Sequence, residues 1–157
     1  MSTPKITEIY ASSAKVNYLS EVVKNRDTKT QITGLTGSSL SFVIQQLFVK
    51  SDLPLLLILQ DKEEAAYYLN DLEQLVNDQD VLFYPGSYRR PYQIEETDNA
   101  NILLRAEVLN RINSRKKPAI IVTYPEALFE KVVTRKDLEK NTLKIAVNDL
   151  VSIDFIK

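Results

Sequence analysis

Two of the three glycines in this chain lie in a stretch whose residue types suit phosphate binding. The stretch runs from Ile32 to Ser41 and reads ITGLTGSSLS. Average usage near 7% would place roughly eleven glycines in a chain of this length, so Gly34 and Gly37 are concentrated at one turn. Glycine is favoured where the backbone needs a positive φ or a close approach to another group, and we therefore predict a special turn here.

A working phosphate loop has the pattern G-x-x-x-x-G-K-[ST]. Its backbone amides and the following helix N-terminus cradle the phosphates, its lysine reaches the β and γ groups, and its hydroxyl holds magnesium. Aligned on Gly34, this chain keeps the first glycine and the final hydroxyl. The residues that remain of the loop are Gly34, Thr36, Gly37, Ser38 and Ser41, while Ser39 and Leu40 replace the required glycine and lysine.

The replacement of the lysine by Leu40 carries most of the chemical consequence. An ammonium about 4 Å from a phosphate charge contributes about 4 kcal/mol at an effective dielectric near 20, which is about a thousandfold in affinity. We therefore expect no catalytic site, although the amides and the helix dipole could hold a weak anion. Leu40 is predicted to be the first core-facing residue of a helix, in step with Ile44 and Leu47.

A possible magnesium-holding carboxylate follows the apolar run Leu55 to Leu59. Asp61 there superficially resembles the aspartate of a Walker B segment. It also begins a helix whose first turn contains Glu63 and Glu64, and negative charge is favourable at a helix N-terminus. We favour this second interpretation.

Two basic segments are candidate contact surfaces. The loop from Ser87 to Tyr92 interleaves aromatic residues with arginines, a combination that stacks on bases or binds a protein partner. Its possible contact residues are Tyr88, Arg89, Arg90 and Tyr92. Acidic residues follow directly, so a protein contact or a solvated loop is favoured over nucleic acid. The basic run 115–117 suits the carboxyl end of a helix.

Composition excludes several kinds of site. The 20 basic and 21 acidic residues give a net charge of −1, which argues against a strongly basic nucleic-acid surface. The chain has no cysteine and no histidine, so disulfides, the usual zinc sites and Ser-His or Cys-His nucleophiles are excluded. We predict no metal site. No leader-like or membrane-spanning segment is present, and we expect a soluble cytoplasmic protein with no membrane partner.

The apolar pattern predicts the elements that must position these residues. Thr30 to Thr33 is expected to be a short strand that leads into the glycine loop. Further strands are predicted at 55–59, 81–84 and 119–123, separated by helices that carry the apolar sets Leu40, Ile44, Leu47 and Phe48; Ala65, Leu69, Leu72 and Val76; and Ile102, Ala106 and Leu109. Pro125 is expected in the first turn of a short helix. Continuous apolar strands alternating with helices indicate an α/β, doubly wound, mainly parallel sheet.

Three segments are expected along the chain. Residues 1–28 form an N-terminal helical appendage, and residues 29–136 form the α/β domain with the degenerate phosphate loop. Residues 137–157 are the start of a second domain that is cut short, with a strand at 143–147 and a helix that Asn148 caps.

The order of these motifs resembles a known family. GLTGSSLS, LLLILQDKEEAAYYLNDLE, VLFYPGSYRRPYQIEETDNANILLRAEVLNRI and AIIVTYPEALFEKV together resemble the N-terminal UvrB-like module, domain 1a and the start of domain 2, of the bacterial transcription-repair coupling factor (Mfd) family. The resemblance covers about residues 1–150. Domain 1a of UvrB has an intact G-x-T-G-x-G-K-T loop, to which Gly34, Thr36, Gly37 and Ser41 match.

The resemblance implies a role in DNA repair. Full-length family members remove RNA polymerase stalled at DNA damage, translocate on DNA with ATP and magnesium in downstream motor domains, and recruit UvrA for nucleotide excision repair. This module would be a non-catalytic scaffold without a cofactor of its own, beside the domain 2 that binds UvrA. The alternative is a UvrB-like ATP-binding half-site of a DNA-repair helicase. The connection from Pro85 to Asp98 is also too short for the DNA-probing hairpin of UvrB.

Overall fold

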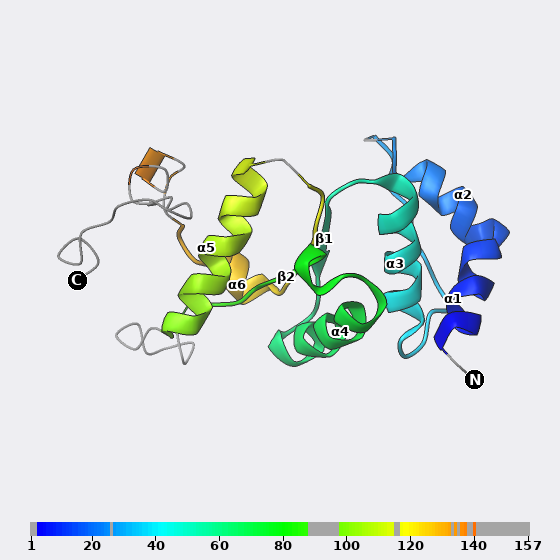
Figure 1. Cartoon of the computed structure of the whole chain (residues 1–157), viewed down its shortest axis with the longest axis horizontal. Coiled ribbons are helices and arrows are strands. Elements are labelled where there is room, and N and C mark those ends of the chain that lie inside the picture. Colours follow the sequence, from blue (N-terminus) through cyan, green and yellow to red (C-terminus); the bar gives the residue numbers. More distant parts are fainter. Residues whose placement is uncertain are drawn as a thin grey trace, which may run out of the picture.

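The computed structural model describes residues 3–25, 27–87, 98–114 and 117–132, together with 134, 136, 137 and 140. Figure 1 shows the arrangement of its elements; from α3 onward, helices alternate with strands along the chain. The elements are α1 (Thr3–Ser12), α2 (Ala14–Val22), α3 (Ser39–Ser51), β1 (Leu55–Ile58), α4 (Lys62–Leu75), the 3-10 turn η1 (Asp78–Asp80), β2 (Val81–Tyr84), α5 (Asn99–Ser114), β3 (Ile120–Thr123) and α6 (Pro125–Phe129).

The three strands form one parallel sheet in the order β1-β3-β2. Leu55 of β1 and Val81 of β2 both pair with Ile120 of β3, so the last strand in the chain is the central one. All four residues of β3 are buried, as expected for a strand with a neighbour on each edge and helices over the sheet. The sequence prediction of these strands is confirmed to within one residue at each end.

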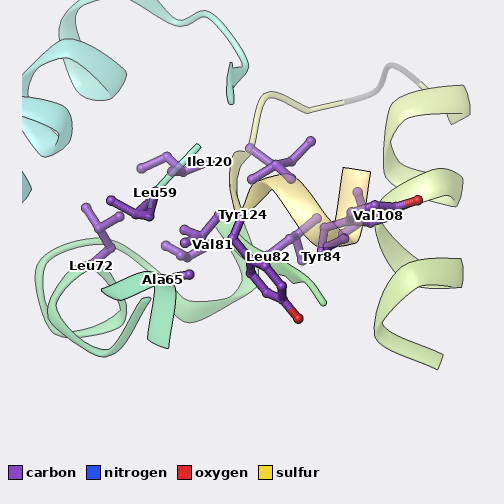
Figure 2. Close-up of a cluster of buried hydrophobic side chains, with 13 residues drawn as sticks. Leu59, Ala65, Leu72, Val81, Leu82, Tyr84, Val108, Ile120 and Tyr124 are labelled. Carbon is purple, nitrogen blue, oxygen red and sulfur yellow. The ribbon is translucent and has the colours of Figure 1, made fainter. Parts of the chain in front are cut away.

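Helices cover the two faces of the sheet, and this confirms an α/β fold with an open parallel sheet. Figure 2 shows Ala65 and Leu72 of α4 on the side of Val81, while Val108 of α5 lies toward Tyr84. The predicted apolar face of α4 is confirmed, because Ala65 and Leu72 are fully buried. Leu69 and Val76 pack partly buried against the same core. Pro125 occupies the first turn of α6, as predicted.

A second, smaller core joins the N-terminal helices to α3. Val16 and Leu19 of α2 pack with Val43 and Leu47 of α3. The rings of Tyr10 and Phe42 stack with centroids 5.2 Å apart. Lys50 of α3 donates hydrogen bonds to the Ala11 carbonyl, at 2.7 Å, and to the Asn17 side chain, which fastens α1 and α2 to α3.

The predicted strand at Thr30 to Thr33 is wrong. Residues 28–36 have no regular secondary structure, and 28–34 are exposed. Ile32 is the single apolar side chain in the predicted strand 30–33, so joining the sheet would bury little apolar surface. The helix that follows packs against α2 instead, which draws the segment toward the N-terminal helices.

The predicted apolar face of α5 is only partly confirmed, because Leu109 alone of the three predicted residues packs against the main core. Arg105 and Val108 are its buried residues, whereas Ile102 is exposed and Ala106 and Leu109 are only partly buried. The face that α5 directs to the core is rotated from the predicted face by about one residue, or roughly 100°. The cause is the Arg105 guanidinium, which backbone carbonyls hold inside.

Several predictions lie outside the described residues. They are the contact loop with Tyr88, Arg89, Arg90 and Tyr92, the strand at 143–147 and the helix after Asn148. In the part of the chain that the structure describes, no helix has the length and apolar character needed to cross a bilayer.

Candidate functional site: the glycine loop and the carboxyl ends of the strands

The glycine loop has the backbone turn that its composition predicts. Gly34 has φ +82° and Gly37 has φ +53°, both in the region that favours glycine. A Cβ atom at either position would meet no atom of the described residues within 4 Å, apart from its own chain neighbours. Backbone conformation, rather than close packing, is therefore the reason for glycine at both positions.

The Ser39 side chain closes the loop on itself. Its hydroxyl donates to the Thr36 carbonyl and accepts from the Thr36 amide, each at 2.7 Å. The Ser39 amide also donates to the Thr36 carbonyl at 3.2 Å. A working phosphate loop keeps such amides free for the ligand, so the residue that replaces the second glycine uses one of them internally.

Two further hydroxyls of the loop, those of Ser38 and Ser41, are directed toward α4. The Ser38 and Tyr67 hydroxyls lie 2.8 Å apart. Ser41, at the position of the magnesium-binding hydroxyl, is fully buried and donates to an Asp71 carboxylate oxygen at 3.0 Å. Ser41 therefore links α3 to α4, and Asp71 brings a negative charge to the first turn of α3, where it would disfavour a phosphate.

Leu40 does not have the core position predicted for it. It is only partly buried and belongs to neither apolar cluster, whereas the next residue, Ser41, is fully buried. The cause is the hydrogen bond from Ser41 to Asp71, which turns the serine rather than the leucine toward α4. No basic residue occurs between Lys29 and Lys50, so the loop and α3 supply no nearby cation of their own before Lys50.

Asp61 caps α4, as the favoured interpretation predicted. Its carboxylate accepts from the Glu64 amide at 2.8 Å, and Glu64 in turn accepts from the Gln60 amide at 2.8 Å. This reciprocal pattern satisfies two N-terminal amides. Among the described residues, no group of three or more acidic, cysteine or histidine side chains is placed to hold a metal ion.

A buried polar cluster lies at the carboxyl ends of β2 and β3, where open α/β sheets place their sites. Arg105 of α5, only 6% exposed, donates to the carbonyls of Pro85 and Ala127 at 2.7 and 3.1 Å. Its guanidinium lies 4.2 Å from the centre of the Tyr84 ring and 3.4 Å from a Glu130 oxygen. One guanidinium nitrogen, Nη2, has no hydrogen-bond partner among the residues that the structure describes.

Glu130 occupies the position that a bound anion would take in this cluster. Its carboxylate accepts from the Ser87 amide at 2.8 and 2.9 Å and from the Ser87 hydroxyl at 2.6 Å. The Tyr124 hydroxyl accepts from the Gly86 amide at 2.9 Å. The chain therefore pairs the Arg105 cation and the Ser87 amide with its own carboxylate, and the Gly86 amide with a tyrosine hydroxyl. The cluster ties the end of β2 to the end of α6.

The two tyrosines of the cluster are shifted toward their neutral forms. Burial is the main cause that raises the pKa of Tyr84, with Glu130 adding to the rise and Arg105 opposing it. Burial also raises the pKa of Tyr124, while its hydrogen bond from Gly86 acts in the opposite direction. At neutral pH both hydroxyls are protonated, and neither is an activated base.

Sequence reasoning missed this cluster. Arg105 lies within an apolar helical pattern and Glu130 follows a five-residue helix, so neither forms a recognisable motif. The available signal was Gly86, the third glycine. A Cβ atom there would lie 2.8 Å from a Glu130 oxygen and 3.3 Å from the Tyr124 hydroxyl, so this glycine marks a close approach.

A shallow apolar cavity of about 470 Å³ lies beside the glycine loop. It is bounded by Tyr10, Val16 and Leu19 of the first two helices and by residues 30–35.

Comparison with known proteins identified no relative. No family model, no curated protein and no solved structure matches the chain.

Proposed function

We propose that this chain is a non-catalytic scaffold and interaction domain, of the kind found at the N-terminus of transcription-repair coupling factors. In this role it would support an adjoining domain that binds UvrA, within a larger protein that removes stalled RNA polymerase from damaged DNA. The motif order described above supports this assignment. The chain would need neither ATP nor magnesium for its own task.

The internal hydrogen bonding of the glycine loop is the observation that carries the proposal. Ser39, which replaces the second glycine, accepts a hydrogen bond from the Thr36 amide through its hydroxyl. The hydroxyl of Ser41, at the position that binds magnesium in a working loop, donates to Asp71. Leu40 supplies no charge to a phosphate. Each feature removes a different part of nucleotide binding. The contacts of Ser38 with Tyr67 and of Ser41 with Asp71 instead connect the loop and the start of α3 to α4.

Equilibrium titration with a fluorescent ATP analogue and magnesium tests the proposal. We expect no binding by the natural chain at nucleotide concentrations up to about 1 mM, which corresponds to less than about 4 kcal/mol of binding free energy. Micromolar binding would overturn the scaffold proposal and favour the alternative, a UvrB-like ATP-binding half-site. The positive φ angles of Gly34 and Gly37 are the observation in favour of that alternative.

Two variants distinguish a loop that has lost its binding groups from one that has also lost the backbone geometry of a phosphate loop. The variant Ser39→Gly with Leu40→Lys frees the Thr36 amide and restores the cation, and Asp71→Asn added to it removes the opposing carboxylate. We expect the affinity to rise from the natural chain to the double variant and again to the triple variant. The single variant Asp71→Asn is the control, because it alters charge without supplying a cation. Equal binding by all four proteins would contradict this account of the loop.

The assignment to DNA repair is tested separately by surface plasmon resonance on immobilised UvrA. The proposal places the UvrA-binding surface on the adjoining domain 2, so the probe is this chain joined to the domain 2 of a coupling factor, with domain 2 alone as the control. We expect the joined protein to bind UvrA more tightly than domain 2 alone, and ATP to leave that binding unchanged. Equal binding by the two proteins would overturn the DNA-repair assignment of this chain, whatever the outcome of the nucleotide titration.

A further inference from the structure

Strand β1 has an unpaired outer edge. Among the described residues it pairs only with β3, and the sheet order β1-β3-β2 places it at one side of the sheet. The edge from Leu53 to Gln60 contains no charged residue. Soluble proteins usually protect exposed edges with lysine or other charges within the strand, and that protection is absent here.

The backbone groups on this outer edge follow from the pairing with β3. The amides of Leu55 and Leu59 donate to the carbonyls of Ala119 and Thr123 at 3.0 and 2.9 Å. Successive residues in a strand direct their amides and carbonyls to opposite sides. The amides and carbonyls of Leu56 and Ile58 therefore point outward, away from β3.

The side chains of these two residues are also uncovered. Leu56, Ile121 and Leu82 lie side by side across the sheet, and their exposed fractions are 55%, 9% and 5%. Ile58 occupies the same face and is 53% exposed, whereas its neighbour Thr123 is fully buried. Helix α5 packs over β2, so cover on this face decreases from β2 to β1.

At each end of this edge one residue has no backbone amide hydrogen free to pair, and these two blocked positions lie symmetrically about Leu57. Pro54, two residues before Leu56, has no amide hydrogen. The amide of Gln60, two residues after Ile58, already donates to Glu64 at 2.8 Å. Over the described part of the chain, two free donors and two free acceptors thus lie between two blocked positions. An isologous two-fold interface requires such self-complementarity.

We propose that two copies of this chain associate through antiparallel pairing of their β1 edges. In the register fixed by the blocked ends, Leu56 of one copy lies opposite Ile58 of the other, and Leu57 lies on the two-fold axis. Leu56 and Ile58 then exchange four hydrogen bonds with their counterparts, and their exposed side chains cover one another. The two three-stranded sheets become one six-stranded sheet.

Other registers satisfy fewer groups. A shift that places Leu56 opposite its own counterpart sets Ile58 against Pro54, which has no amide hydrogen to donate. A shift that places Ile58 opposite its own counterpart sets Leu56 against Gln60, whose amide is already bonded to Glu64. The four-residue strand is too small to bury the roughly 800 Å² per partner of a typical stable interface, so we expect a weak dimer, with Kd on the order of tens of micromolar.

Sedimentation equilibrium tests the dimer with a matched pair of lysine variants. We expect the natural chain to change from its monomer mass of 17.9 kDa to twice that mass as its concentration increases through the micromolar range. Ile58→Lys places charges on the paired edge and should raise Kd at least tenfold. Val49→Lys, at an exposed apolar site on α3, should leave Kd unchanged. A monomer at all concentrations up to about 1 mM would overturn the proposal.

A disulfide identifies the surface that the dimer uses. The natural chain has no cysteine, so Leu57→Cys supplies one thiol per copy, and the two would face each other at a non-hydrogen-bonded pair about 4.5 Å apart between Cα atoms. We expect rapid formation of a disulfide-linked dimer by Leu57→Cys and slow formation by Val49→Cys. A dimer that Ile58→Lys does not weaken, or equal cross-linking at both positions, would show that another surface is used and would overturn the pairing.

Discussion

Replacing Glu130 with alanine should weaken the fold more than its place near the surface suggests. The substitution removes the carboxylate beside Arg105, whose side chain is 8% exposed, and Glu130 itself is 16% exposed. It also leaves the Ser87 amide without its acceptor. A buried guanidinium that loses its partner is costly because the charge stays out of water.

The structure sets the expected size of this effect. Breaking a fully buried ion pair costs about 3 to 5 kcal/mol. The pair here is 3.4 Å long, and Arg105 keeps its bonds to two carbonyls and its contact with the Tyr84 ring. These retained contacts lower the cost, whereas the unpaired Ser87 amide adds to it, and we expect a loss of about 3 kcal/mol in the free energy of unfolding.

Urea denaturation measures this loss. With a slope of about 2 kcal/mol per molar urea, the unfolding midpoint should fall by about 1.5 M at an unchanged slope. Glu130→Gln keeps an oxygen that accepts from Ser87 and should cost about half as much. Glu21→Ala is the control, because it removes an exposed ion pair with Lys24 and should cost no more than about 0.5 kcal/mol. A shift for Glu130→Ala within that of the control would refute the reasoning.

Two further predictions concern the same cluster. Gly86→Ala should lower the free energy of unfolding by about 1 to 3 kcal/mol, because the new Cβ would lie 2.8 Å from a Glu130 oxygen that Ser87 and Arg105 hold in place. Urea denaturation should find a much smaller loss when Glu130 is already alanine. An equal loss in both backgrounds would contradict the steric explanation. Because burial raises the pKa of Tyr84 and Tyr124 in the folded state, their contribution to stability is fully present below the unfolded value of about 10 and is lost as pH rises through the folded values. Unfolding free energies measured from pH 8 to 11 should therefore fall above about pH 10. The fall should be less steep in the double variant Tyr84→Phe with Tyr124→Phe than in the control Tyr18→Phe, which changes an exposed tyrosine. Identical slopes would contradict the assignment of the pH dependence to Tyr84 and Tyr124.

The strands of the sheet could be predicted from sequence because burial on both faces leaves a direct pattern. The run 119–123 is apolar except for Thr123, and its hydroxyl is satisfied by the Tyr84 carbonyl at 2.8 Å. The cap at Asp61 was also predictable, since a helix N-terminus is a local feature that depends on a few adjacent residues.

The failures occurred where distant contacts override the local pattern. The sequence does not indicate that Arg105 rather than Ile102 faces the core, because the carbonyls that hold it belong to Pro85 and Ala127. The position of Leu40 depended in the same way on Asp71, thirty residues away from Ser41. The turn at Gly34 and Gly37 was predictable as a turn, but the internal bonds that occupy it were not.

The position of β3 at the centre of the sheet has a consequence for how the chain folds during synthesis. Leu55 and Val81 have no strand partner among the described residues until Ile120 has been made, roughly 65 residues after Leu55. At about 5 to 20 residues per second, the ribosome takes about 3 to 13 s to cover that distance. Throughout this interval the uncharged segment 53–60 is outside any sheet, and the helices of the smaller N-terminal core are complete before it. The nascent chain therefore gains its helical layer first and its sheet last, with the period of greatest aggregation risk in between.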